Sequence, residues 1–322
     1  MIMKERLYPV KAKKLEALLR RLKDNHPKAT LIEQEYAKIL AGYRGEQSLN
    51  YFLSFLPQEQ YYIFHDLRLP SLQNEYFFQM DILLLSQQFF LIIEVKNIAG
   101  SVTYDPSNQQ LIQYHQDKET VYQDPFLQVQ RQKQQLYKWI DKVNIQTPPP
   151  ISILVILSNS QTLIKENATS QNLKIIRPER LIDKVSEYEK IYKYECISPK
   201  DLKKLSRHLL KNHTPEEYDA LQKFGLYADD LITGVHCPKC SYLPMVKKQF
   251  TWLCPRCKFE NYEVFMPSLL DYYYLFGSTI DNPKLRAFLN VSSRHTAKRI
   301  LQRLNLPRTG NTKAATYTLP FD

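Results

Sequence analysis

The chain has 322 residues and a formal net charge of +11 at pH 7, with 43% hydrophobic and 24% charged residues. This composition is typical of globular proteins, and the length allows two or three domains. The apolar runs are far shorter than the roughly 20 residues of a membrane-spanning helix, and the basic N-terminus is not followed by the apolar core of a signal peptide. We therefore expect a cytoplasmic protein with no membrane partner. The positive charge favours nucleic acid as a partner.

The chain begins with helical spacing and then changes to strands. Apolar residues recur at i, i+3, i+4 and i+7 in Leu15–Leu22 and in Ile32–Leu40, and a third helix is expected from Tyr43 to Leu56. Four short segments rich in aromatic or branched residues then predict a strand meander: Tyr61–Leu67, Phe77–Leu85, Phe89–Lys96 and Leu111–Tyr114.

Helices and strands alternate farther along the chain. A helix is predicted from Pro125 to Val143, followed by strands at Ile151–Leu157 and Leu173–Ile176. Three further helices are predicted: Pro178–Tyr194, Pro199–Lys211 and Pro215–Lys223. This order indicates a mixed α/β sheet with helices on its faces.

Charged side chains interrupt two of the predicted strands. Side chains alternate along a strand, so Glu94 and Lys96 share a face. If a hairpin joins this strand to the preceding one, Asp81 lies opposite the same end. Two converging carboxylates repel unless a cation lies between them, and Mg²⁺ prefers oxygen ligands. Asp81, Glu94 and the Val95 carbonyl are the candidate Mg²⁺ ligands; the alternative is that Glu94 and Lys96 form only a surface ion pair.

The pattern D-x12-E-x-K resembles the core of the PD-(D/E)xK nucleases. More of the sequence resembles the nuclease-related domain (NERD) family, over roughly residues 30–185. The residues that carry this resemblance are Gly45-Glu46, Gln79-Met80-Asp81, Ile93-Glu94-Val95-Lys96-Asn97 with Gly100, and Asp124-Pro125 with Gln128. Met80 and Asp124 depart from the family pattern. Asp124 leaves the expected helix cap intact, because Asp caps about as well as Asn.

The resemblance implies a restriction-endonuclease-like fold and Mg²⁺- or Mn²⁺-dependent hydrolysis of phosphodiester bonds. It implies catalytic roles for Glu46, Asp81, Glu94, Lys96 and Gln128. Lys96 would stabilise charge in the transition state, and Gln128 would orient water or a phosphate. An exposed helix acid is the alternative for Glu46, and a backbone hydrogen bond or solvent contact is the alternative for Gln128.

Four of the five cysteines form two CPxC turns separated by thirteen residues. The pattern C-x2-C-x13-C-x2-C is close to that of four-thiolate zinc sites, and it predicts a zinc ribbon with Met245–Leu253 as its strand pair. Four thiolates leave no open position on the ion, so we expect the zinc to be structural. The predicted ligands are Cys237, Cys240, Cys254 and Cys257.

The last part of the chain is basic and helical. Helices are predicted at Ser268–Phe276, Lys284–Leu289 and Ser293–Leu304, with short strands around residue 310. This pattern predicts a helix-turn-helix, with a wing as a further possibility, that contacts double-stranded DNA. Eight basic residues and one acidic residue lie from 284 to 322. The predicted DNA contacts, unless they form only a solvated face, are Arg294, His295, Lys298 and Arg299.

These observations predict four domains. They are a nuclease-like domain with N-terminal helices (residues 1–195), a helical connector (196–235), a zinc ribbon (236–266) and a helix-turn-helix module (267–322). We interpret the protein as a metal-dependent nuclease that acts on DNA. The alternatives are an inactive DNA-binding or regulatory protein on the same scaffold and a protein-interaction scaffold.

Overall fold

The computed structural model describes residues 1–322 except 74, 146, 166–174, 250, 311–314 and 322. It divides into two compact units. Unit 1 comprises Met1–Leu7 and Leu40–Glu216, and unit 2 comprises Tyr8–Ile39 and Glu217–Asp322. The units are therefore interleaved along the sequence. Helix α1 (Val10–Arg21) belongs to unit 2, whereas the predicted division grouped it with the nuclease-like domain.

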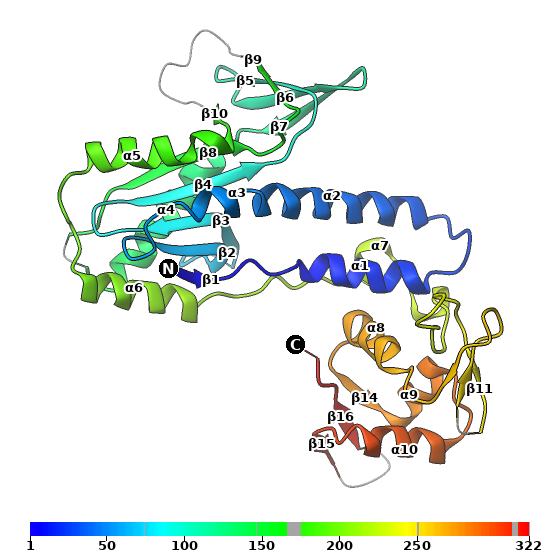
Figure 1. Ribbon diagram of the computed structural model, residues 1–322. Helices are drawn as coiled ribbons and strands as arrows, with labels where there is room; N and C mark the ends of the chain where they lie inside the picture. The colour runs from blue at the N-terminus through cyan, green and yellow to red at the C-terminus, as the bar shows by residue number, and fades with distance from the viewer. Residues whose placement is uncertain (74, 146, 166–174, 250, 311–314, 322) are drawn as a thin grey trace. The chain divides into compact units, whose positions relative to one another are not determined.

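Among the described residues, six strands form a mixed sheet in unit 1, in the order β1-β2-β3-β4-β8-β10 (Figure 1). The β2–β3 and β3–β4 pairs are antiparallel, and the other pairs are parallel. The strands are β1 (Ile2–Lys4), β2 (Tyr62–Pro70), β3 (Phe77–Leu85), β4 (Phe90–Lys96), β8 (Ile151–Leu157) and β10 (Ile175–Ile176). The predicted mixed α/β sheet is confirmed. Part of the predicted strand Leu173–Ile176 lies outside the described residues.

Helices cover both faces of this sheet. Helices α4 (Pro125–Asp141) and α6 (Pro199–Lys211) pack on the face that carries Leu83 and Ile92. On the other face are α3 (Leu49–Leu53), the 3₁₀ turn η1 (Pro178–Arg180) and α5 (Leu181–Ile191). Because both faces are buried, β3 and β4 are apolar along most of their length. A carboxylate on β4 is therefore removed from bulk water.

A second sheet in unit 1 has the order β7-β6-β5-β9. Its strands are β5 (Ser101–Asp105), β6 (Gln110–His115), β7 (Lys118–Gln123) and β9 (Leu163–Lys165). The predicted strand Leu111–Tyr114 thus belongs to this sheet and does not extend the central one. Gly100 lies where the chain turns from β4 toward the second sheet. Its φ is +80°, and a Cβ there would lie 2.4 Å from the carbonyl oxygen of Tyr114, so only glycine fits.

Two predicted helix boundaries are wrong. No break occurs at Tyr43, because α2 (Ala29–Gln47) is continuous through it. The helix predicted at Pro215–Lys223 begins only at Ala220, as α7 (Ala220–Phe224), since the Asp219 side chain caps it by accepting from Gln222 N at 2.9 Å. No helix among the described residues is long and apolar enough to cross a membrane.

A buried ion pair organises unit 2. The Arg21 guanidinium of α1 donates to Asp271 of α8 (Met266–Phe276) at 2.9 Å, and both side chains are fully buried. Arg21 also donates to the carbonyl oxygens of Ile232 and Gly234 at 3.1 and 3.2 Å and lies over the Phe288 ring. This one side chain therefore joins α1 to α8 and to the segment that leads into the cysteine turns. The 3₁₀ turn η2 (Ala228–Asp230) precedes that segment.

The rest of unit 2 contains two small sheets. The first is the antiparallel sheet β11-β12-β13 beside the cysteines, and the second has the order β14-β16-β15. Helices α9 and α10 lie between β14 and β15 in sequence, joined by a short turn. The bounds are β11 (Val246–Lys247), β12 (Trp252–Leu253), β13 (Glu260–Asn261), β14 (Thr279–Asp281), α9 (Asn282–Leu289), α10 (Arg294–Arg303), β15 (Arg308–Thr309) and β16 (Thr316–Thr318).

Candidate functional site

Strands β3 and β4 separate at the position of Asp81. Their pairing ends with Ile82 opposite Ile93. Beyond that pair, Asp81 Oδ2 accepts a hydrogen bond of 2.8 Å from the backbone N–H of Val95. The carboxylate therefore replaces the ladder bond that would have continued the pairing. This arrangement places Asp81 beside Glu94, as the predicted hairpin requires.

Glu94 is buried and both of its carboxylate oxygens have partners. Lys96 Nζ donates to Oε1 at 2.7 Å, and Gln132 Nε2 donates to Oε2 at 3.1 Å. Lys96 also donates to Gln128 Oε1 at 3.0 Å. Glu94 is 2% exposed and the Lys96 side chain is 25% exposed. The Glu94 carboxylate is therefore buried and the Lys96 side chain is only partly exposed. The alternative of a solvated surface pair is wrong.

Helix α4 positions the two glutamines. Its N-terminus is capped by Asp124, whose Oδ1 accepts from Phe126 N at 2.7 Å, and Pro125 follows as the first helical residue. The capping role expected for Asp124 is confirmed. Gln128 and Gln132 are four residues apart and therefore project from the same face of the helix. That face is turned toward the charged end of β4.

Glu46, at the end of α2, is ion-paired with Arg6. The Arg6 guanidinium also contacts Asp66 at 2.7 Å, and donates to the carbonyl oxygen of Asp81 at 3.2 Å. The Arg6 side chain is 2% exposed. Asp66 has a φ of +50° within β2, a conformation that is rare for a residue other than glycine and that clusters at functional sites. Arg6 thus connects Glu46 to the two central strands.

Gly45 and Asn97 hold α2 against the ends of β4 and β8. A Cβ on Gly45 would lie 2.5 Å from Asn97 Cβ and 2.6 Å from Ser158 Oγ. Asn97 Nδ2 donates to the carbonyl oxygen of Ala41 at 2.6 Å. The absent side chain of Gly45 therefore lets the helix approach closely enough for Glu46 to reach the site. Gly45 and Asn97 thus together determine where Glu46 lies.

Burial makes two carboxyl groups of this site, those of Asp81 and Glu46, hard to ionise. The pKa of Asp81 is raised well above that of a free aspartate by burial, and the negative charge of Glu94 raises it further. The pKa of Glu46 is raised by burial and then by the charge of Asp81, although Arg6 opposes the shift. Burial and the adjacent Arg6 lower the pKa of His65 to about 4, so its imidazole is neutral at pH 7. The site therefore has more carboxyl groups than cations, which are Arg6 and Lys96.

Asp81, Glu94 and the Val95 carbonyl offer oxygen donors at the point where the strands separate. Two adjacent carboxylates match the preference of Mg²⁺ or Mn²⁺ for oxygen ligands. Gln132 Oε1, which is buried and has no partner, adds an unused acceptor beside Glu94. The residues present therefore fit a divalent metal. Among the described residues, the group of three or more His, Cys, Asp or Glu ligand atoms that lie within 4.8 Å of one another is the set of four cysteines in unit 2. The described carboxylates of unit 1 do not form such a group.

An open hollow of about 610 Å³ adjoins the site. Gln128 and Gln132 line it from α4, and Gln79 lines it from β3. Two of these glutamines contact Lys96 and Glu94 directly, so a molecule in the hollow would lie next to the charged residues. The hollow therefore reaches the glutamines that contact Lys96 and Glu94, whereas the charged residues themselves are not part of its lining.

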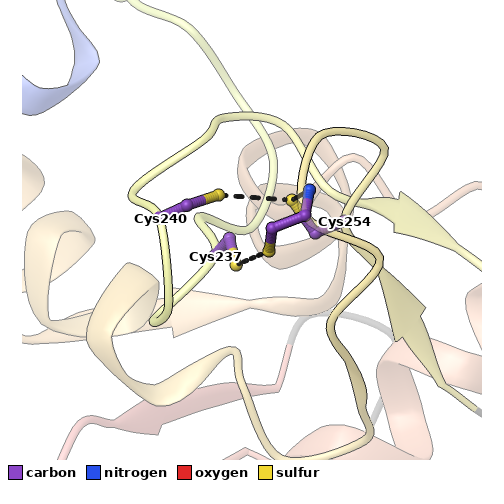
Figure 2. Close-up of side chains that lie close together, drawn as sticks. Cys237, Cys240 and Cys254 are labelled. Atoms are coloured by element: carbon purple, nitrogen blue, oxygen red, sulfur yellow. Dashed lines mark hydrogen bonds between the residues drawn. The ribbon is translucent and has the colours of Figure 1, made fainter.

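The four cysteines of the two CPxC turns converge at one point (Figure 2). The Sγ atoms of Cys237 and Cys257 are 3.6 Å apart, and those of Cys240 and Cys254 are 3.5 Å apart. All four sulfurs lie within 4.8 Å of one another. Sulfurs about 2.3 Å from a central zinc at tetrahedral angles would have similar separations. The cluster is consistent with a zinc ribbon and could bind one Zn²⁺.

The predicted DNA contacts lie on one helix. Arg294, His295, Lys298 and Arg299 are all exposed residues of α10. The opposite side of α10 is buried through Ala297, Ile300 and Leu301. The helix therefore presents its basic side to solvent.

Three residues of the unit 1 site were missed in the sequence. They are Arg6, Asp66 and Gln132. Gln132 follows Gln128 by one helical turn, and that spacing was the signal that could have revealed it. Arg6 and Asp66 carry no local signal, because only the parallel pairing of β1 with β2 brings Arg6 to the site.

Unit 1 thus combines a mixed sheet with an acid on β3 and an E-x-K sequence on β4. Residues 41–158 match the family model of the nuclease-related domain (NERD), so the resemblance found in the sequence is confirmed for this segment. No curated protein and no solved structure matches the chain. The nuclease-related domain suggests a nuclease-like function and a nucleic-acid partner.

Proposed function

We propose that this protein is a Mg²⁺- or Mn²⁺-dependent nuclease that hydrolyses phosphodiester bonds of DNA. The observation that carries the proposal is the buried cluster of Asp81, Glu94 and Lys96, which combines metal-type oxygen donors with a fixed cation. Asp81, Glu94 and the Val95 carbonyl would hold the metal, which supplies activation of water and neutralises charge.

The chain's own residues have separate roles in this proposal. Lys96 stabilises negative charge on the phosphate oxygens in the transition state, because its ammonium group is the more exposed partner of the Glu94 pair. Gln128 orients Lys96 through their 3.0 Å hydrogen bond. Glu46 contributes negative charge next to Asp81, and Arg6 fixes its position.

Unit 2 would hold the DNA. Helix α9, the turn and α10, followed by the β15–β16 hairpin, have the order of a winged helix-turn-helix, and Arg294, His295, Lys298 and Arg299 are exposed on the second helix. The cysteine cluster would bind structural Zn²⁺ with Cys237, Cys240, Cys254 and Cys257.

The test is cleavage of supercoiled plasmid, linear duplex, single-stranded DNA and RNA with Mg²⁺, with Mn²⁺ or with no added metal. We expect metal-dependent DNA cleavage that is lost in Asp81→Ala and Lys96→Ala. The exposed residues Lys118 and Glu119 of β7 provide matched controls, and Lys118→Ala and Glu119→Gln should cleave as the unsubstituted protein does. If the purified protein cleaves none of these substrates, the proposal is wrong.

The second candidate is an inactive DNA-binding protein on the same scaffold. The Arg6–Glu46 ion pair favours it, because a carboxylate neutralised by a buried guanidinium is less available to a metal. Salt-sensitive duplex binding without any cleavage, unchanged in Asp81→Ala, would identify this function.

A further inference from the structure

Two hollows flank helix α10 within unit 2. The first, of about 920 Å³, lies between the ribbon strand β11, helix α9 and one side of α10. The second, of about 670 Å³, lies between the other side of α10 and the strands of the β15–β16 hairpin. The exposed side of α10 therefore has a concave surface on each side of it.

Both hollows are lined by cations. Lys247 and Lys248 of the ribbon, Arg286 of α9 and Arg299 of α10 line the first hollow. Arg294 and Lys298 of α10 and Arg308 of β15 line the second. Asp and Glu are absent from both linings as far as the structure describes them. Neither set of cations therefore has an acidic partner inside its hollow.

The cations of the first hollow come from separate parts of the fold, and Arg299 is close enough to Lys247 for their charges to repel each other. Burial lowers the pKa of Lys247, and the positive charge of Arg299 lowers it further. The Lys247 ammonium is 5.3 Å from the Trp252 ring centroid and donates to the Lys248 carbonyl at 2.7 Å, so it is held in place. Like charges fixed so close to one another are stabilised by an anion between them. Lys248, by contrast, is exposed.

We propose that the ribbon edge Lys247–Lys248 binds the phosphate backbone of duplex DNA together with Arg286 and Arg299, while the second hollow binds the backbone on the other side of α10. This inference rests on the proposed DNA-binding role of α10. In this proposal the ribbon does more than stabilise the fold. Its edge binds one phosphate backbone, and the β15–β16 hairpin binds the other on the opposite side of α10. A helix in the major groove has one phosphate backbone on each side, which matches the two hollows.

The salt dependence of binding tests the proposal. Each phosphate contact adds about 0.9 to the slope of log affinity against log salt concentration for duplex DNA. Fluorescence anisotropy with a labelled duplex would be measured from 50 to 200 mM KCl, using the zinc-loaded full chain without added Mg²⁺ or Mn²⁺. We expect Lys248→Ala to reduce the slope by about 0.9, and Lys248→Ala with Arg308→Ala to reduce it by about 1.8.

Lys239 provides the matched control. It is an exposed lysine of the first cysteine turn and lies outside both hollows. Lys239→Ala should leave the slope unchanged, with equal zinc content in all variants. A slope in Lys248→Ala equal to that of the unsubstituted protein would overturn the ribbon clamp and leave the proposed DNA-binding function intact. If the unsubstituted protein binds no duplex at low salt, both fail. Equal affinity for a single strand of the same length would overturn the assignment to a duplex backbone.

Discussion

Asp81→Asn should stabilise the protein without metal and abolish its response to metal. In the structure the Asp81 carboxylate is buried beside Glu94 and accepts one hydrogen bond, from Val95 N at 2.8 Å. The amide of Asn keeps an oxygen for that bond and removes the charge. Because one unit of pKa shift corresponds to about 1.4 kcal/mol, we expect the free energy of unfolding to rise by at least about 1 kcal/mol at pH 7.

Metal should reverse the order of stabilities. A ligand present at 100 times its dissociation constant stabilises the folded form by about 2.7 kcal/mol. Mg²⁺ should therefore stabilise the unsubstituted protein and leave Asp81→Asn unchanged. Hydrogen exchange of peptides that cover β3 and β4, measured by mass spectrometry, reports the stability of unit 1 separately from unit 2. Glu119→Gln is the control for loss of an exposed acid.

The same variant changes the pH dependence. An acid whose pKa is raised on folding binds a proton that the unfolded chain has released, so stability falls as pH rises from 3.8 toward the raised pKa. The slope should be shallower in Asp81→Asn. Destabilisation of this variant, or a response to Mg²⁺ as large as that of the unsubstituted protein, would refute the argument that a buried, electrostatically unfavourable carboxylate at Asp81 binds metal.

Three further predictions concern other parts of the protein. Gln132→Leu leaves the buried acceptors on Glu94 and Gln79 without their donor, so the free energy of unfolding of unit 1 should fall by about 1–3 kcal/mol in urea titrations; no change would contradict the role of these bonds. Arg21→Met removes the buried donor to Asp271 Oδ2, while Arg20 still donates to Oδ1 at 2.7 Å, so unit 2 should be destabilised by about 1.5–3 kcal/mol; no measurable loss would show that the Arg21 pair is dispensable. Metal analysis should find one Zn²⁺ per chain and less in Cys254→Ser, and chelation should make residues 237–257 sensitive to protease; full metal content in that variant would rule out the four-thiolate site.

The sequence predicted best what local pattern controls. The limits of β3 and β8 were predicted to the residue, and β4 to within one residue, because runs of apolar branched residues ended at turns. The convergence of Asp81 and Glu94 also followed from strand alternation and a hairpin. In unit 2 the spacing of the cysteines placed their cluster.

The parts that depend on distant pairing could not be predicted. Arg6 comes to the site only through the parallel pairing of β1 with β2, which has no signature in a three-residue strand. The helix start predicted at Tyr43 is wrong. Helix α2 continues through Gly45, although glycine normally weakens a helix. A side chain at position 45 would collide with Asn97, so glycine is required there despite its low helix propensity. This contact exists only in the folded unit, and the local sequence does not reveal it.

The interleaving of the two units has a consequence for synthesis of the chain. Helix α1 is translated before the strands β2 to β10 of unit 1, whereas most partners of Leu15, Leu18 and Arg21 in unit 2 lie after residue 216. Apart from Ile32 and the neighbouring side chains of α2, its apolar side therefore has no native partner until the residues after 216 have been translated. We infer that unit 1 can complete its core first and that unit 2 closes last, during which α1 is open to chaperones or to a neighbouring chain. A chain that ends at residue 216 would leave α1 without its partners from the later part of unit 2.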